Sequence, residues 1–250
     1  MTISELYDHF RLPLSAHVGQ RVPKKLLVEN GAPTAADKRQ INEGIEELLW
    51  LAALKPTTIG VTEYRDDVRE YLEIAVLSLI LRPPAKAGRL VELIHRAVPY
   101  PLLLVVEQSD SISLSAAHKR WSQGEAGKTV LDDAVTLCDL VESDTTSSFL
   151  DSLSLTLQPR DNLLVLYRGW INCLQAYQAA QITGRFVPSS SAEVALSRHG
   201  ALVEYNRLVH QMAALRTQAE RESQINRRVE LNLEIKRLEP ELAESIRKME

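Results

Sequence analysis

Two apolar runs joined by an amphipathic segment dominate the middle of the chain. The first run, residues 72–81 (LEIAVLSLIL), is apolar at both alternating positions apart from Glu73 and Ser78, which is typical of a central strand with both faces covered. Residues 86–97 have apolar positions at helical spacing, and residues 102–106 form a second apolar run. The stretch therefore predicts strand, helix and strand. A connection of this length favours parallel strands with a right-handed crossover.

A hairpin is predicted to follow the second run. Ser109 and Asp110 form a plausible two-residue turn, and residues 111–116 then alternate between apolar residues and serine, as in a half-buried strand. With this turn Gln108 faces Ser111, and counting back along both strands sets residue 101 opposite residue 118. A further strand is expected near residues 134–140.

The chain before the first run is predicted to be mostly helix and loop. Thr2 and Glu5 have capping-box spacing and open a short helix, and a loop follows over residues 11–33. Thr34 and Asp37 open a longer helix that is expected to continue to Pro56. Its apolar face would consist of Ile41, Ile45, Leu48, Leu49 and Ala52. A short strand is expected over residues 59–61, and the charged run 63–70 is expected to be a turn or an edge loop.

Helical patterns dominate from residue 147 onward. An apolar stripe over residues 163–177 predicts a helix that Gly184 ends, and residues 188–191 (PSSS) are the best linker candidate. Beyond this linker, Tyr205, Leu208, Met212, Leu215 and Ala219 step by three or four residues, as a coiled-coil seam does.

The seam fails over residues 220–224 and restarts in a shifted phase. The restarted positions are Leu231, Ile235, Leu238, Leu242 and Ile246, and Val229 and Leu233 would widen this second stripe. A phase shift indicates either a stutter in one helix or a turn between two packed helices. Because no glycine or proline lies between Ala201 and Glu239, one continuous helix is favoured.

These elements together predict the fold class and the domains. We expect an α+β or α/β fold, with a small mixed sheet around a β-α-β-β core, flanking helices, and a long C-terminal coiled-coil-like extension. The expected domains are a mixed α/β domain over residues 1–143, a helical segment over 144–187, and a long helix or helical hairpin over 188–250.

Composition narrows the class of protein without identifying it. The 250 residues are 45% hydrophobic and carry a net charge of −4, which argues against a surface that binds nucleic acid over its whole extent. Cys138 and Cys173 have neither metal-site spacing nor further partners, as expected in a reducing compartment. No signal peptide is apparent, and the longest apolar run is about half a membrane span. A cytoplasmic protein without membrane contact is expected.

Common catalytic motifs are missing from the sequence. It contains no GxxxxGK[ST], GxGxxG, GxSxG or HExxH, which argues against a nucleotide hydrolase, a Rossmann dehydrogenase and a zincin. A nuclease with a PD-(D/E)xK site matches poorly, because Glu107 is followed by Gln108 and Ser109 where a lysine is needed. No cofactor and no metal site are predicted.

Polar groups are nevertheless expected to converge where the two parallel strands begin. Four segments reach this rim, since the crossover helix ends there and the hairpin strand returns to it. The candidate binding residues are Tyr71, Glu73, His95, Arg96, Tyr100, His118, Lys119, Arg120 and Trp121.

Three interpretations of the rim stay open. It could be a structural network in which Glu73 pairs with Arg96 and cations cap the helix. It could be a contact site, since Arg and Lys bind phosphates and aromatic rings stack on bases. Glu73 with His95 or His118 could also supply acid–base chemistry or metal ligands. Against catalysis, open α/β sheets usually place ligands at the carboxyl ends of parallel strands, and this rim is the amino end.

The segments REYLEIAVLSLIL, IHRAVPYPLLLVVE, LSAAHKRW and QINRRVELNLEIKRLE resemble a bacterial family, number four-three-nine-one of the domain-of-unknown-function series. The resemblance covers nearly the whole chain. Members of that family tend to be encoded beside DNA methyltransferases and superfamily-two helicases, in restriction-like or phage-defence clusters. The resemblance implies an accessory subunit of such a system and supplies no catalytic residues.

The leading hypothesis is an adaptor subunit of a DNA-targeting defence complex. It would bind the helicase or the methyltransferase, a second copy of itself, or DNA. Assembly would use the tail residues Leu208, Met212, Leu215, Leu231, Ile235, Leu238 and Leu242. The alternatives are a metal-dependent nuclease with Glu73, His95, His118 and Lys119 at its site, and a self-assembling coiled-coil protein.

Overall fold

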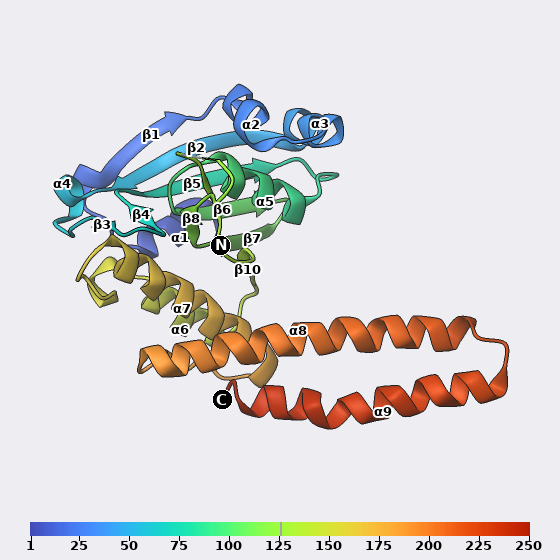
Figure 1. The fold of residues 1–250 in the computed structure, drawn as a ribbon. Coiled ribbons are helices and arrows are strands. Elements are labelled where there is room, and N and C mark those ends of the chain that lie inside the picture. Colours follow the sequence, from blue (N-terminus) through green and yellow to red (C-terminus); the bar gives the residue numbers. More distant parts are fainter. Residues whose placement is uncertain (126) are drawn as a thin grey trace. The chain divides into compact units, whose positions relative to one another are not determined.

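The computed structural model describes residues 1–125 and 127–250, which pack as two units, Met1–Leu174 and Gln175–Glu250 (Figure 1). Unit 1 is a mixed α/β unit, as predicted. Its strands are β1 (His17–Arg21), β2 (Ile45–Leu54), β3 (Tyr64–Arg65), β4 (Glu70–Tyr71), β5 (Ile74–Leu81), β6 (Leu102–Gln108), β7 (Ser111–Ala116), β8 (Lys119–Trp121), β9 (Thr129–Leu131) and β10 (Thr136–Leu140). Its helices are α1 (Ile3–His9), α2 (Lys24–Gly31), α3 (Ala35–Gly44), α4 (Pro56–Ile59), α5 (Ala87–Ala97) and α6 (Asp144–Ser152), with short 3-10 turns at Leu14–Ala16 and Leu155–Leu157.

A six-stranded sheet with the order β1-β2-β5-β6-β7-β10 forms the centre of unit 1. The pair β5–β6 is parallel and the other neighbours are antiparallel, so the predicted strand–helix–strand unit is confirmed. The predicted hairpin is also confirmed, because Gln108 pairs with Ser111 across the turn. Its Ser109 has a φ of 55°, the left-handed conformation that tight hairpin turns require.

One face of this sheet is covered by α2, α3 and α5. Alternate residues of β5, from Ala75 to Leu81, pack with Leu90, Leu93 and Ile94 of α5 in one core. Helix α2 approaches α5 closely at Gly31, where a Cβ would lie 2.7 Å from the Cβ of Ala97. A side chain at this position would therefore force the two helices apart.

Helix α3 is tied to α5 by an ion pair as well as by apolar packing. Arg89 donates to both oxygens of the nearly buried Asp37, from Nε at 2.8 Å and from Nη2 at 3.0 Å. Hydrogen bonds from Arg89 and Thr34 lower the pKa of Asp37 to about 2. The predicted cap Thr34 is thus in place, with its hydroxyl accepting from the backbone of Asp37.

The opposite face of the sheet is covered by α1, and α6 and the first part of α7 (Leu163–Thr183) pack next to α1. The ring of Phe10 lies 6.0 Å from that of Trp170, edge to face. Trp170 donates its indole N–H to the carbonyl of Leu153 at 2.8 Å. These contacts confirm the predicted apolar stripe on α7, which Gly184 ends with a φ of 79°.

The long helix predicted over residues 34–56 is wrong. The helix ends at Gly44, and the remaining apolar positions form β2, which pairs with β5 on one side and β1 on the other. The spacing of Ile45, Leu48 and Ala52 fits a helical face, but neighbouring strands on both sides pair the backbone of this segment and cover its apolar side chains. Register shifts next to Glu47 and Ala52 accommodate this irregular pattern in the strand.

Two smaller predictions in the N-terminal half are also wrong, and a third is confirmed in part. Residues 11–33 were expected to form a loop, but they contain β1 and α2, because pairing with β2 and packing on α5 stabilise short segments of weak intrinsic pattern. Residues 59–61 do not form the expected strand, since Ile59 ends helix α4 and Gly60 is its C-cap with a left-handed φ of 67°. The charged run 63–70 contains the expected turn, since the amide of Asp66 donates to the carbonyl of Arg69, but this turn joins the short strands β3 and β4 of a two-stranded ribbon. Strands β8 and β9 form a second ribbon.

Unit 2 is a helical hairpin made of α8 (Ala192–Arg221) and α9 (Ile225–Arg247), together with the end of α7. Leu208, Met212, Leu215, Leu231, Ile235 and Leu238 form the buried seam between α8 and α9, with Leu242 partly buried beside them. The continuous helix is therefore wrong and the alternative hairpin is correct. Residues 222–224 break the helix without glycine or proline, and the seam compensates for the broken backbone hydrogen bonds. Within residues 1–125 and 127–250, no helix is both long and apolar enough for a membrane span.

Candidate functional site

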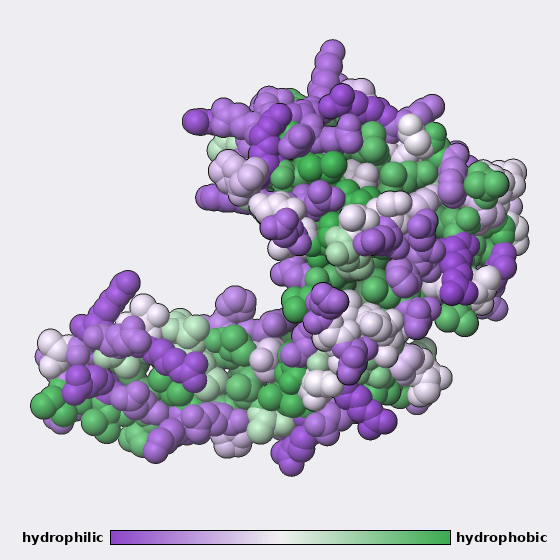
Figure 2. Space-filling view, turned by 180° about the vertical axis from the view of Figure 1, so that it is seen from behind, coloured by the Kyte–Doolittle hydropathy of each residue, from purple (hydrophilic) through white to green (hydrophobic). Residues whose placement is uncertain are grey.

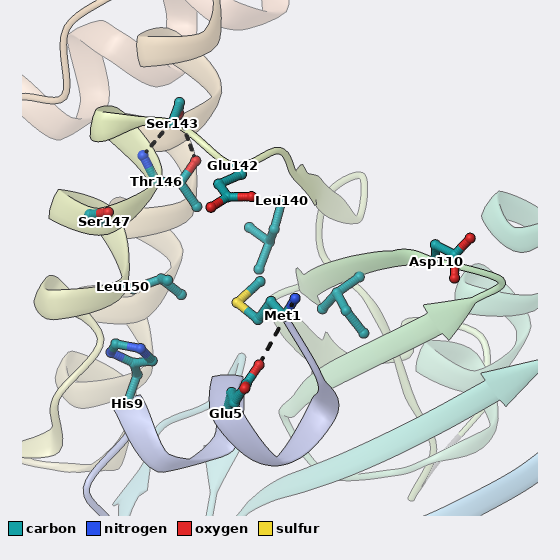
Figure 3. A pocket seen from close by; sticks show the side chains of 11 residues that line it. Met1, Glu5, His9, Asp110, Leu140, Glu142, Ser143, Thr146, Ser147 and Leu150 are labelled. Atoms are coloured by element: carbon teal, nitrogen blue, oxygen red, sulfur yellow. Dashed lines mark hydrogen bonds and ion pairs between the residues drawn. The ribbon is translucent and has the colours of Figure 1, made fainter.

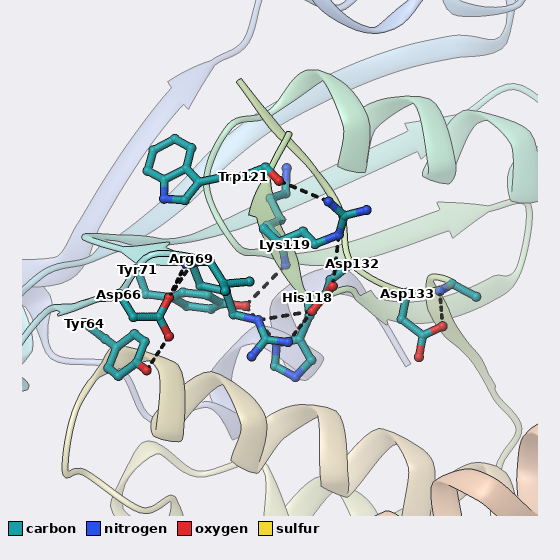
Figure 4. Close-up of polar contacts among 12 residues, drawn as sticks. Tyr64, Asp66, Arg69, Tyr71, His118, Lys119, Trp121, Asp132 and Asp133 are labelled. Atoms are coloured by element: carbon teal, nitrogen blue, oxygen red, sulfur yellow. Dashed lines mark hydrogen bonds and ion pairs between the residues drawn. The ribbon is translucent and has the colours of Figure 1, made fainter. Parts of the chain in front are cut away.

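The candidate site is the rim of the sheet at which β5 and β6 begin and β7 ends. Strand β4 leads into β5 at this rim, and β8 continues from β7. The polar side chains that meet here come from the two ribbons and the segments next to them, which Figure 4 shows, and from β7, α5 and α7. We call this set of contacts the rim network. Its members are Arg69, Tyr71, His95, Ser115, His118, Lys119, Arg120, Asp132 and Tyr167.

Tyr167 of α7 separates the ends of β6 and β7. Its hydroxyl lies 2.7 Å from the carbonyl of Leu102 and 3.1 Å from that of Ala117, and it accepts from the amides of the same two residues at 3.2 and 3.0 Å. The register of β6 and β7 would otherwise pair Leu102 with Ala117, but direct pairing stops at Leu104 and Ser115. The phenol thus replaces one rung of the ladder, and the chain diverges into β8.

Tyr71, which is buried, and His118, which is half-buried, form the contact that links the β3–β4 ribbon to the end of β7. The Tyr71 hydroxyl lies 2.8 Å from His118 Nδ1 and accepts from the amide of Lys119 at 3.3 Å. Burial lowers the pKa of His118 to about 4, helped by the nearby cations Arg168 and Arg69, and burial raises the pKa of Tyr71 to about 12. The imidazole is therefore neutral at pH 7, with Nδ1 placed to accept the phenol proton.

Lys119 caps the end of α5 from β8. Its ammonium donates to the carbonyl of His95 at 2.5 Å and to that of Val98, where the helix ends and carbonyls lack partners within the helix. Lys119 is 3% exposed, and burial lowers its pKa to about 7. The two helix-end carbonyls favour the charged form of Lys119, so the role of this lysine is to cap the C-terminal end of α5.

His95 lies on the last turn of α5 and is fully buried. Its Nε2 is 3.0 Å from the hydroxyl of Ser115 on β7, and its Nδ1 has no hydrogen-bond partner among the described residues. Burial, with Lys119 nearby, lowers the pKa of His95 to about 3. A neutral imidazole inside the α5–β7 interface is the result.

Asp132, which follows β9, forms ion pairs with two arginines. Arg69 donates to one of its oxygens from Nε at 3.1 Å and also from Nη2, and Arg120 Nε lies 3.2 Å from the other oxygen. The carboxylate therefore joins the loop before β4 to β8. The backbone reinforces the join, since the amide of Trp121 donates to the carbonyl of Val68 at 2.8 Å.

The remaining predicted residues lie outside this network. Glu73 is 5% exposed and pairs with Lys55 at 2.9 Å, while Arg96 pairs with Glu92 on its own helix. The expected pair between Glu73 and Arg96 is therefore wrong, because the two side chains have nearer partners. The ring of Tyr100 packs against that of Trp50, with centroids 6.1 Å apart.

Sequence reasoning missed Arg69, Asp132 and Tyr167, and it missed Lys55 as the partner of Glu73. Arg69 and Asp132 lie in charged segments that look like solvated loops, and Tyr167 lies in an apolar stripe where a core role is the simpler expectation. The chain contains no local signal that pairs residues so far apart. The fold brings them together: the ribbons set Arg69 beside Asp132, and α7 sets Tyr167 between the ends of β6 and β7.

The chemistry of the rim network favours a structural role, in which its hydrogen bonds and ion pairs hold the ribbons to the sheet. Both histidines are neutral, the lysine is engaged by helix carbonyls and the aspartate is held by two arginines. Among the described residues, no three His, Cys, Asp or Glu side chains gather as metal ligands.

A separate cavity of about 500 Å³ lies between α1, α6 and the ends of β7 and β10 (Figure 3). Met1, Ile112, Leu140 and Leu150 contribute apolar groups to its lining, and Glu5, His9, Asp110 and Glu142 contribute polar groups. Glu5 is engaged, because it accepts from the backbone of Thr2 at 2.7 Å in the predicted capping box.

The comparisons with known proteins identify the family and no activity. Residues 10–242 match the family described as "Domain of unknown function (DUF4391)", so the chain belongs to this family. Neither a curated protein nor a solved structure shows significant similarity to it.

Proposed function

We propose that this protein is an accessory adaptor subunit of a bacterial DNA-targeting defence complex. In this proposal the α/β unit is a rigid scaffold, and the helical hairpin binds a partner protein. The family resemblance supports a helicase or a DNA methyltransferase of the same gene cluster as that partner.

The observation that carries the proposal is an exposed apolar stripe on α9. Ile225, Val229 and Leu233 follow one another at intervals of four residues and are 69%, 51% and 51% exposed. At about 100° per residue they lie roughly opposite the seam residues Leu231, Ile235 and Leu238 on the helix. Val229 and Leu233 thus do not widen the seam, contrary to the sequence-based prediction, because the hairpin turns them to the surface.

An outward stripe of this kind is typical of helices that bind another protein. The outer positions of a helix in a monomeric hairpin are normally polar, and apolar side chains there lack an internal packing role. Figure 2 shows hydrophobic residues at the surface of the hairpin among hydrophilic ones. The charged residues beside the stripe, which include Glu230, Lys236 and Arg237, provide the polar border that protein interfaces share.

The rim network supports the scaffold part of the proposal. Its titratable groups are used to hold β3–β4, β8–β9, α5 and the sheet together, as the hydrogen bonds of Tyr71, Lys119 and Asp132 show. No observation on the described residues favours the nuclease, so we do not propose it as a second function.

Co-purification with the proposed helicase and methyltransferase partners tests the proposal. The tagged full chain is co-expressed with each candidate, as wild type and as the double variant Val229→Lys, Leu233→Lys. Both sites are half exposed and lysine has good helix propensity, so the variant should fold. Wild type should retain a partner and the variant should lose most of it.

The matched control places two lysines four residues apart on α8. Ala214 and Gln218 are exposed, and Ala214→Lys with Gln218→Lys adds the same charge without touching the stripe. This control should retain the partner. If wild type binds neither candidate, the adaptor proposal fails. A solution mass that falls from oligomer to monomer in the stripe variant would instead support the self-assembling alternative.

A further inference from the structure

A cavity of about 370 Å³ lies within unit 2, where the segment before α8, the first turns of α8 and the end of α9 meet. Nine residues line it: Val187, Pro188, Ser190, Val194, Ser197, Arg198, Lys248, Met249 and Glu250. Its volume is well above the roughly 30 Å³ that one water occupies in the liquid. The cavity therefore has room for a small group of atoms beside its polar lining.

Arg198 is the unusual member of this lining, because its charge is buried without a counter-ion. The residue is 3% exposed, and burial lowers its pKa. Its Nη1 donates to the hydroxyl of Ser189 at 2.8 Å, while its Nε is buried without a hydrogen-bond partner. Within the part of the chain that the structure describes, no carboxylate lies within ion-pair distance of Arg198.

An unpaired buried guanidinium is costly, and an anion in the cavity would offset that cost. A guanidinium has five N–H donors in a planar fork, and Ser189 accepts from only one of them. A buried arginine that lacks a protein carboxylate is thus left with donors that suit a ligand carrying several oxygens.

The surroundings of Arg198 also favour negative charge. Ser190 and Ser197 contribute hydroxyl groups and Lys248 contributes an ammonium to the lining. The cavity borders the N-terminal end of α8, a helix of 30 residues that begins after its cap Ser191. The positive end of the helix dipole attracts anions. Glu250 is the opposing group, since it also lines the cavity, and Glu244 lies 3.8 Å from Lys248.

We propose that this cavity is a binding site for a phosphate monoester, with Arg198 as its central ligand. A terminal phosphate has three oxygens, which the guanidinium, the serine hydroxyls and the Lys248 ammonium can approach from different directions. A planar carboxylate would use fewer of these donors. The proposal is independent of the proposed adaptor function, because it uses neither the stripe on α9 nor the rim network.

Isothermal titration of the full chain with inorganic phosphate at constant ionic strength tests the site. The wild type should bind, and Arg198→Met should weaken binding at least tenfold. Met matches the length of the arginine stem, and removal of a buried unpaired charge should leave the fold intact or stabilise it. The matched control is Arg237→Met, which removes an exposed arginine of α9 and should leave binding unchanged.

Two further variants keep the test decisive if Arg198→Met does not fold. Lys248→Met should weaken phosphate binding several-fold, and Glu250→Gln should tighten it, because one removes an attractive charge and the other a repulsive one. Unchanged affinity in both variants, or no binding by the wild type, would overturn the proposal.

The source of the phosphate is distinguished by the choice of probe. Inorganic phosphate, a nucleoside monophosphate, and a short single-stranded DNA with either a 5′-phosphate or a 5′-hydroxyl are compared on the wild type and on Lys248→Met. Tighter binding of the nucleotide or of the 5′-phosphorylated DNA, sensitive to Lys248→Met, would identify the source and support the site. Equal binding of both DNA ends, insensitive to this substitution, would contradict it.

Discussion

Removal of one hydroxyl, in Tyr167→Phe, is expected to destabilise the rim of the sheet. The hydroxyl is shared by the amides and carbonyls of Leu102 and Ala117, residues that are 0% and 2% exposed. A hydroxyl has one hydrogen and two lone pairs, so it serves both amides and one carbonyl at a time. Phenylalanine would leave these backbone groups buried without partners.

The size of the effect follows from the number of groups left unpaired. Each buried unsatisfied polar group costs about 1–3 kcal/mol. Three such groups give about 3 kcal/mol at the lower end of that range, which we adopt because the ends of β6 and β7 can partly close on each other. For a unit of this size, a loss of about 3 kcal/mol corresponds to a fall in Tm of roughly 6–12 °C.

Urea unfolding followed by circular dichroism measures this loss. The control is Tyr100→Phe, which removes a hydroxyl without a hydrogen-bond partner among the described residues and leaves the ring on Trp50. The control should change the free energy of unfolding by less than about 0.5 kcal/mol. Equal effects of the two substitutions would refute the role of Tyr167 as a replacement rung.

Three further predictions concern pH, the hairpin and DNA. The free energy of unfolding should fall as the pH is lowered from about 6.5 to about 4, because His95 and His118 become protonated in the unfolded chain and stay neutral in the folded chain. Each histidine contributes on the order of 3 kcal/mol to this loss. Urea titrations at pH 7 and pH 5 should show a smaller difference in the free energy of unfolding for His118→Gln than for the wild type. Leu208→Ala should cost about 2–5 kcal/mol in thermal unfolding, since Leu208 is fully buried in the α8–α9 seam, and Leu196→Ala, at a 72% exposed site, should cost little. Purified protein with Mg²⁺ or Mn²⁺ should leave single- and double-stranded DNA intact on a gel, whereas cleavage that disappears in Glu73→Ala would establish the nuclease.

The central part of the sheet was predictable because its signals are local. Two-sided hydrophobicity over residues 74–81 indicates a buried strand, and a two-residue turn fixes the register of the hairpin, which brings His118 back to the rim. Strand β2 was not predictable, because the spacing of Ile45, Leu48 and Ala52 also fits a helix. Pairing with β5 decides between the two, and that contact is not encoded locally.

The rim network was predictable only as a meeting point of segments. Counting along strands places Tyr71 and His118 at the same edge, but the direction of a side chain depends on its tertiary surroundings. The pair between Arg69 and Asp132 joins residues 63 apart, and Tyr167 is 65 residues from Leu102. The break over residues 222–224 is likewise stabilised by the seam between α8 and α9, whereas its own sequence has no helix-breaking residue.

The most direct test of the adaptor proposal is the dissociation constant between the purified full chain and the helicase or methyltransferase that the proposal names as its partner. We expect the wild type and the Ala214→Lys, Gln218→Lys control to bind equally well. The Val229→Lys, Leu233→Lys variant should bind at least a hundredfold more weakly, since about 1.4 kcal/mol for each lost apolar contact is a tenfold change. Equal affinity of the wild type, the control and the Val229→Lys, Leu233→Lys variant for the partner, or no binding by the wild type, would contradict the account.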